Sequence, residues 1–210
     1  EQQAIHDSVF IPQDIDTAKW NQSYNANIAD STTVPHLTIL GTGDGSPDFY
    51  AFEITEEMLE AALNEYKDAH GGGSDGFPGL RVFFDIDHGF DWGDSQFWSS
   101  QLKLYELRDP LDPEQPKTPN LLKEGAYFSF FIDEGSTFYF DGRLEHYIQE
   151  TGTYYLEVTA ALPVGLDGLP EGVDYELHAS VEQHATDAFL FAPEAVLEDE
   201  AENYRFGKTT

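Results

Sequence analysis

The sequence contains no cysteine, which excludes disulfide bonds, thiol catalysis and cysteine-ligated zinc. Basic residues are also scarce: 10 Lys and Arg stand against 40 Asp and Glu, and the formal net charge is -30. This balance argues against nucleic acid as a partner, because that affinity comes from cations that neutralise phosphates. It argues equally against anionic membrane surfaces. No apolar run is long enough to span a bilayer, so we expect no membrane insertion.

An excess of acid strains a compact chain by self-repulsion, and something must offset that strain. High external salt and bound divalent cations can both do so. Salt adaptation alone is one explanation of the bulk charge, but it does not explain why the aspartates cluster in glycine-rich turns. An extracellular chain without disulfides needs another means of stabilisation, and calcium is a common one. We therefore predict Ca²⁺ as the cofactor and an extracellular or cell-surface location. We also expect this sequence to be one domain of a larger chain.

Large aromatic side chains supply enough apolar surface for a real core: there are 16 Phe, 11 Tyr and 3 Trp. A single β-sandwich often reaches this length. We expect one domain over 1–210, with its core at about 27–182. An extended segment at 1–26 and an acidic tail at 185–210 flank that core.

One segment has helical periodicity. Thr55 can cap a helix over about 56–69, in which apolar residues recur at spacings of three and four, and Gly71 to Gly73 then break it. The other apolar runs are short, alternate with period two and are separated by turn residues. These predicted strands span 36–40, 49–54, 80–86, 102–106, 126–132, 144–148, 153–160 and 175–181, with an exposed Pro-rich loop at 109–120. The pattern predicts an all-β, jelly-roll-like sandwich with one inserted surface helix.

A series of short motifs between about residue 27 and 182 resembles the bacterial pre-peptidase C-terminal domain. The motifs are GTGDG (41–45), DFY (48–50), DID (85–87), LKL (102–104), DEGS (133–136) and GTYYLEV (152–158). The resemblance implies a jelly-roll-like sandwich related to collagen-binding modules and to the ligand-binding modules of adhesins. It also implies calcium binding, since several such modules bind that ion.

Three loops carry the oxygen-rich side chains that calcium prefers. Gly lets the backbone turn inward in such loops, and Asp has a short reach. Within the densest loop, the first two aspartates stand at i and i+2 of a strand end, so they share a face and repel each other without a cation. For any single Asp the alternative is a turn-forming or solvated residue. The candidate ligands are Asp44 and Asp48 in the first loop, Asp85, Asp87, Asp91 and Asp94 in the second, and Asp133 and Asp141 in the third.

Aromatic residues beside these loops suit the face of a sugar or the side chains of a peptide. Packing into one end of the sandwich is the alternative for each of them. The candidate ligand-binding residues are His88, Phe90, Trp92 and Tyr139.

The sequence has no HExxH spacing, no GxSxG and no phosphate-binding glycine loop, so we predict that the protein is not an enzyme. We expect instead a calcium-dependent adhesion module that recognises a peptide or glycan on another cell or matrix. One alternative is a structural spacer that calcium stabilises and that binds no ligand. The other is a jelly-roll carbohydrate-active enzyme, since acidic pairs are abundant.

Overall fold

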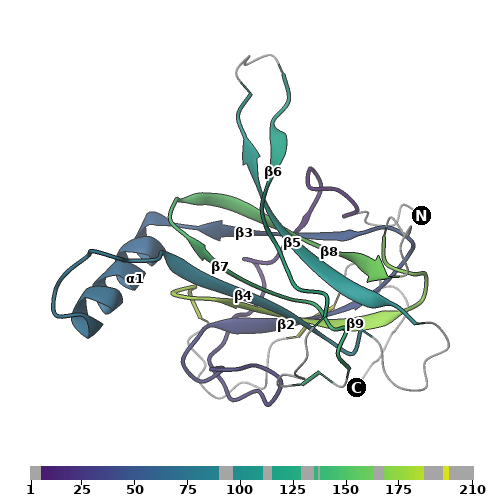
Figure 1. The fold of residues 1–210 in the computed structure, drawn as a ribbon, viewed down its shortest axis with the longest axis horizontal. Helices are drawn as coiled ribbons and strands as arrows, with labels where there is room; N and C mark the ends of the chain where they lie inside the picture. The colour runs from purple at the N-terminus through teal and green to yellow at the C-terminus, as the bar shows by residue number, and fades with distance from the viewer. Residues whose placement is uncertain are drawn as a thin grey trace.

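Alternating apolar residues form two five-stranded sheets in the computed structural model (Figure 1). The structure describes residues 6–89, 97–110, 115–128, 135–136, 138–162, 168–186 and 196–198. The first sheet has the order β1 (Gln13–Asp14), β3 (Asp48–Ile54), β8 (Gly152–Leu162), β5 (Ser99–Arg108) and β6 (Thr118–Glu124). The second has the order β10 (Val196–Glu198), β2 (His36–Thr42), β9 (Asp174–Val181), β4 (Leu80–Asp87) and β7 (Arg143–Ile148).

The connectivity is that of a jelly roll. The chain changes sheet at each connection from β1 to β5 and again from β6 to β9, so that β2, β9, β4 and β7 lie opposite β3, β8, β5 and β6. All pairings among these eight strands are antiparallel, whereas β1 and β10 join the outer edges in parallel. The all-β sandwich with one inserted helix that the sequence predicts is therefore confirmed.

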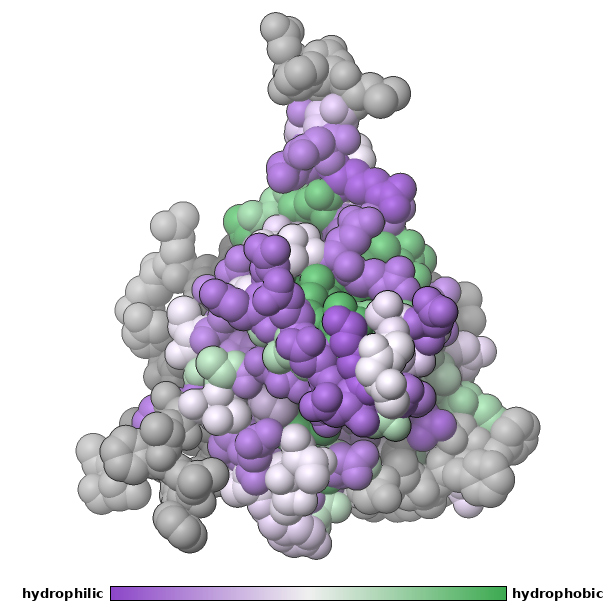
Figure 2. All heavy atoms as spheres, turned by 90° about the vertical axis from the view of Figure 1, so that its left-hand side faces the viewer, coloured by the Kyte–Doolittle hydropathy of each residue, from purple (hydrophilic) through white to green (hydrophobic). Residues whose placement is uncertain are grey.

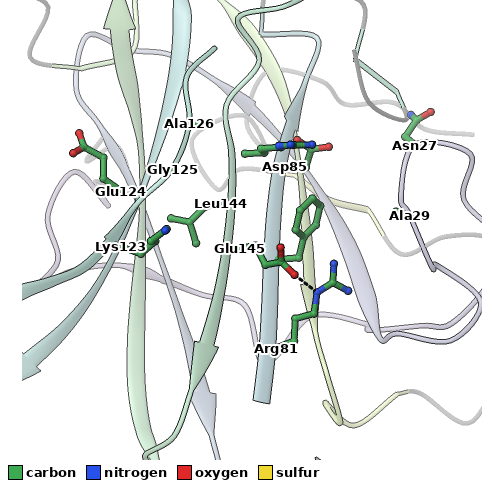
Figure 3. A pocket seen from close by; sticks show the side chains of 12 residues that line it. Asn27, Ala29, Arg81, Asp85, Lys123, Glu124, Gly125, Ala126, Leu144 and Glu145 are labelled. Carbon is green, nitrogen blue, oxygen red and sulfur yellow. Dashed lines mark hydrogen bonds and ion pairs between the residues drawn. The ribbon is translucent and has the colours of Figure 1, made fainter. Parts of the chain in front are cut away.

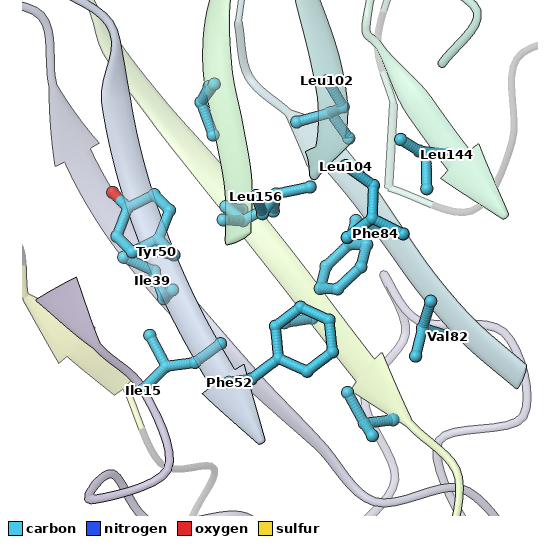
Figure 4. Packing of buried hydrophobic residues seen from close by; sticks show 14 of the residues in the cluster. Ile15, Ile39, Tyr50, Phe52, Val82, Phe84, Leu102, Leu104, Leu144 and Leu156 are labelled. Atoms are coloured by element: carbon cyan, nitrogen blue, oxygen red, sulfur yellow. The ribbon is translucent and has the colours of Figure 1, made fainter. Parts of the chain in front are cut away.

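The core lies between the sheets and is built from every second residue of each strand (Figure 4). In β4, the even-numbered residues from Leu80 to Ile86 are completely buried against the opposite sheet. The odd-numbered residues of β4 therefore face outward. The N-terminal segment adds Ile15 and Trp20 to the same core, so this part of the chain packs on the sandwich and closes one side of it.

A glycine makes room for a buried tyrosine of the core. Gly41 lies opposite Tyr175 across β2 and β9, and a Cβ at Gly41 would overlap the tyrosine ring. The Tyr175 hydroxyl donates a hydrogen bond to Asp48 at 2.5 Å and lies 2.6 Å from the hydroxyl of Tyr50. Burial raises the pKa of Tyr175 well above its ordinary value, and the neighbouring Tyr50 and Asp48 add to that effect.

The predicted helix is present as α1 (Glu56–Ala69). Thr55 caps it, because its side chain accepts a hydrogen bond from the Met58 amide at 3.3 Å. Met58 and Ala62 are its buried residues, and the rest of the helix lies at the surface. Seen from the side that carries the helix, the molecule is mostly hydrophilic with scattered hydrophobic patches (Figure 2). None of the helices in the described ranges is long and apolar enough to cross a membrane.

The acidic turn predicted at 41–45 is present, and it joins β2 to β3, which belong to opposite sheets. Two other local expectations differ from the structure. The Pro-rich loop at 109–120 ends earlier than predicted, because β6 already begins at Thr118 and pairs with β5 in an exposed hairpin. Of the strand predicted at 126–132, Ala126 forms an isolated bridge with Arg143, and 129–132 lie outside the described residues. Part of the predicted acidic tail, residues 196–198, pairs with β2.

Candidate ligand groove and acidic cluster

The jelly roll gathers the predicted acidic loops at one end of the sandwich. Strand pairing places the end of β2 beside the start of β9, and Asp87 at the end of β4 opposite Glu176. The start of β7 lies next to them, because Arg143 pairs with Asp85. Strand ends that are far apart in the sequence therefore lie side by side, with Asp85 and Asp87 on one of them.

The first predicted loop does not place its two aspartates in the same environment. Asp44 is exposed, and its side chain accepts a hydrogen bond from the Ser46 amide at 3.0 Å, as a turn-forming residue does. Asp48 is buried between the sheets, where it accepts the Tyr175 hydroxyl and lies 3.6 Å from His6 Nδ1. Asp48 therefore acts in the core as an acceptor for a buried tyrosine.

Asp85 and Asp87 share the outer face of β4, as their i, i+2 spacing predicts. Both are buried even though they face away from the core. Part of the cover over Asp87 is Gly135: a Cβ at this position would overlap the Asp87 carboxylate and lie 2.8 Å from Cβ of Asn27. Gly135 also has a positive φ of 90°, so two independent constraints favour glycine there.

The carboxylate of Asp87 is completely buried and is held by neighbouring polar groups. Ser136 Oγ donates a hydrogen bond to Asp87 Oδ1 at 2.9 Å, and His178 Nε2 lies 3.1 Å from Oδ2. The other ring nitrogen of His178 lies 2.9 Å from Thr38 Oγ1, and Glu176 approaches His178 to 3.9 Å. A buried carboxylate is stable only when a cation or donors compensate it. Here an imidazole and a hydroxyl supply part of that compensation.

Asp141 is buried beside the turn that follows β4. A Cβ at Gly89 would lie 2.9 Å from Asp141 Oδ1. The next residue, Gly142, bonds through its carbonyl to the Ile86 amide at 2.9 Å. The segment around Asp141 is therefore packed against the end of β4, close in the fold to Asp87.

The donor set available in the described residues does not by itself complete a calcium site. These residues contain no group of three or more His, Asp or Glu side chains arranged to hold a metal ion. Calcium needs six to eight oxygens, so Asp85, Asp87 and Asp141 would need further ligands. The remaining predicted ligands, Asp91, Asp94 and Asp133, lie outside the described residues, as do the predicted ligand-binding residues Phe90 and Trp92.

The other two predicted ligand-binding residues have different settings. His88 is half-buried and has a left-handed backbone with a φ of 55° at the end of β4. Tyr139 is exposed, and its ring lies 6.4 Å from that of Phe138. Neither residue lines the groove described next.

A groove of about 660 Å³ crosses the outer face of the second sheet (Figure 3). Its floor is formed by β4 and β7. The loop around Asn27 and Ala29 borders one side, and the end of β6 with Gly125 and Ala126 borders the other. Asp85 lines the groove and is also one of the buried aspartates Asp85, Asp87 and Asp141, which we call the acidic cluster.

The groove concentrates the scarce positive charge of the chain. Arg81, Lys123 and Arg143 line it, and the whole sequence holds only 10 Lys and Arg. Arg81 Nε bonds to Glu145 at 2.6 Å, and its guanidinium lies 5.4 Å from the centre of the Phe83 ring. Three carboxylates also line the groove, so its acidic and basic side chains are equal in number. They are Asp85, Glu124 and Glu145. The groove is thus locally balanced on a strongly acidic protein, and it presents hydrogen-bonding groups around one aromatic ring.

Comparisons with protein-family models, curated proteins and solved structures gave no match. The resemblance to the pre-peptidase C-terminal domain therefore stays a prediction, and function has to be argued from the site.

Sequence reasoning did not find the groove. Two of its lining residues, Arg81 and Phe83, alternate with core residues along β4, so the sequence pattern marks them only as outward-facing strand positions. Lys123 and Arg143 belong to separate strands that meet only in the fold. One available signal was the contrast between a basic residue on a strongly apolar strand and the acidic composition of the rest of the chain.

Proposed function

We propose that this protein is an extracellular binding module, and that the groove over β4 and β7 holds a peptide or glycan. The observation that supports this most is the placement of three of the chain's 10 Lys and Arg residues around one groove. Guanidinium, ammonium and carboxylate groups bind the hydroxyls of a sugar or the polar groups of a peptide. The half-buried Phe83 ring adds an apolar surface to the lining of the same groove.

Calcium is the second part of the proposal. Asp85 connects the groove to the acidic cluster, because it lines the groove and stands two residues from the buried Asp87. Asp85 and Asp87 would hold the ion together with Asp91, Asp94, Asp133 and Asp141. The ion would neutralise carboxylates that converge on one strand end and would fix the loops beside the groove. The proposal is supported by the negative charge of these residues and by the burial of Asp85, Asp87 and Asp141 among the described ones.

The test is a screen of the wild-type protein on peptide and glycan arrays, in millimolar calcium and in chelator. We expect a subset of probes to bind in calcium and to weaken in chelator. The Lys123→Glu variant should lose those probes. Lys117→Glu is its matched control, since Lys117 is also exposed and lies on the same hairpin, outside the groove.

Two results would contradict the proposal. Equal binding by both charge-reversal variants would place the ligand elsewhere on the protein. The absence of any array hit, in calcium and in chelator, would favour the spacer alternative.

A further inference from the structure

The groove over β4 and β7 reaches an edge of the second sheet. β7 is the last strand of that sheet in the described part of the chain, where β4 is its only full strand partner. Arg143 directs its amide and carbonyl away from β4, because both bond to Ala126, at 3.0 and 2.9 Å. The neighbouring Gly142 bonds in the opposite direction, to Ile86 of β4. Since main-chain groups alternate along a strand, those of Glu145 and Tyr147 also point away from β4.

Only one residue of the preceding segment, Ala126, pairs with β7 at this edge in the described part of the chain. If the antiparallel pairing of Ala126 with Arg143 continued, Glu124 would stand opposite Glu145. Instead Glu124 pairs with Lys103 of β5 in the other sheet. Among the described residues, no main-chain group bonds to Glu145 or Tyr147 on this side. The groove reaches this edge at Glu145, where Gly125, Ala126 and Leu144 also line it.

An open strand edge binds extended chains well, because its unpaired amides and carbonyls can each gain a main-chain partner. A peptide fits such an edge and a sugar does not, since only a peptide repeats donors and acceptors at the strand spacing. The edge is short and carries charged side chains, which limits non-specific pairing with other strands. Selectivity must then come from the side chains around the edge.

Lys123 supplies one such selective feature. It is exposed beside this edge, and it takes part in none of the ion pairs found among the described residues. Burial lowers the pKa of the neighbouring His146 on β7, and the positive charge of Lys123 lowers it further. An acidic side chain on the ligand would pair with Lys123 and relieve this repulsion.

We infer that an extended segment of another protein, carrying at least one Asp or Glu, adds to β7 as a further antiparallel strand. Its main chain bonds to Glu145 and Tyr147, and its carboxylate lies near Lys123. This inference rests on the proposed function and names the ligand class and binding mode of the same groove.

The test uses an array of capped octapeptides in which Asp or Glu is scanned through alternating Thr and Val positions. Glu145→Pro removes the outward amide of residue 145, and proline is tolerated at such an edge position. Glu145→Gln is the matched control, because it loses the same charge and keeps the amide. We expect the proline variant to bind selected peptides at least about tenfold more weakly than the glutamine variant does. Lys123→Gln should weaken acidic peptides several-fold and leave neutral ones unchanged.

A second measurement does not depend on any variant. Amide hydrogen exchange at Glu145 and Tyr147 in the wild type should slow when a selected peptide binds, because both amides gain acceptors. Unchanged exchange at both residues in a saturated complex overturns strand addition, and so does equal binding by the proline and glutamine variants.

Polygalacturonate, an acidic glycan, separates the two proposals. Binding of this polymer that Lys123→Glu abolishes, with no peptide bound, overturns the peptide inference and leaves the groove function standing. Binding of neither class of probe overturns both.

Discussion

Buried polar side chains of this protein depend on particular neighbours. Tyr175 places its hydroxyl between Asp48 and Tyr50 in the core, and Asp87 on the outer face is held by Ser136 and His178. Each arrangement satisfies an oxygen that burial has removed from water. The loss of one partner should therefore cost more than the loss of an exposed hydrogen bond.

The substitution Tyr175→Phe tests this in the core. It removes the hydroxyl that donates a hydrogen bond to Asp48 and leaves the packed ring in place. We therefore expect a loss of about 1–3 kcal/mol in the free energy of unfolding. Urea denaturation measures it. Tyr147→Phe is the control, because Tyr147 is 42% exposed and its bond to Glu145 is 3.4 Å long. It should change stability by less than about 0.5 kcal/mol, and equal effects of both variants would contradict the argument.

Tyr154 gives a pH-dependent prediction at the same scale. Burial, with the negative charges of Glu106 and Glu150, raises its pKa to about 12. In the unfolded chain a tyrosine titrates near about 10. The stability that Tyr154 contributes is therefore fully present below the unfolded pKa and is lost as the pH rises through the folded one. The unfolding free energy should fall over this range.

The slope of that fall is the quantity to measure. Tyr154→Phe should lose less stability than the wild type across the alkaline range, whatever its stability at neutral pH. Tyr24→Phe removes a hydroxyl from a side chain that is 78% exposed and should follow the wild-type slope. Parallel slopes for the wild type and the Tyr154 variant would show that this group does not carry the dependence.

At the scale of elements, local signals predicted α1 and most of the strands. The helix has a cap, a 3.6-residue period and terminal glycines, and β4 and β8 have clear apolar alternation. These features are encoded within each segment, so no knowledge of the fold is needed to find them. The prediction failed for β6, because Pro119 and the polar residues around it resemble a loop although the segment pairs with β5.

The groove and the cover over the acidic cluster are properties of several elements together. Lys123 and Arg81 face one space because β6 ends beside the second sheet, and Gly135 reaches Asp87 from a distant turn. No sequence window contains these contacts. The sequence did predict that Asp85 and Asp87 share a face, since that follows from the period of a single strand.

The helix cap gives a prediction for an element. Thr55→Ala removes the acceptor of the Met58 amide, and we expect a loss of about 1 kcal/mol in the free energy of unfolding. Thr55→Ser keeps an acceptor at the same place and should stay near the wild type. Chemical denaturation followed by circular dichroism compares the three proteins. A similar loss in both variants would mean that the cap is not what stabilises the start of α1.

For the whole molecule, the dominant quantity is the net charge of -30. The jelly roll brings the ends of β2 and β4 and the starts of β7 and β9 together at one end of the sandwich, and the acidic residues on these strand ends repel one another. Monovalent salt should raise the melting temperature by screening. If calcium also binds there, its effect should persist after salt has screened the surface charges.

A thermal melt in calcium and in chelator, at fixed high monovalent salt, measures that second effect. At a calcium concentration about 100 times Kd, one site should add about 2.7 kcal/mol, which is a shift of several degrees. Asp87→Asn should reduce the shift, and Asp44→Asn should retain it, because Asp44 is exposed in a separate turn. Identical melts in calcium and chelator would mean that salt adaptation accounts for the acidic residues.

The most direct test of the proposed function is a hydrogen-exchange footprint of the wild-type protein with an array-selected ligand at saturation. The groove proposal predicts slower exchange along β4 and β7, at Arg81, Phe83 and Glu145, with little change elsewhere in the sandwich. Protection confined to the turns around His88 and Tyr139, with none along β4 and β7, would contradict it and place the ligand at the end of the sandwich instead.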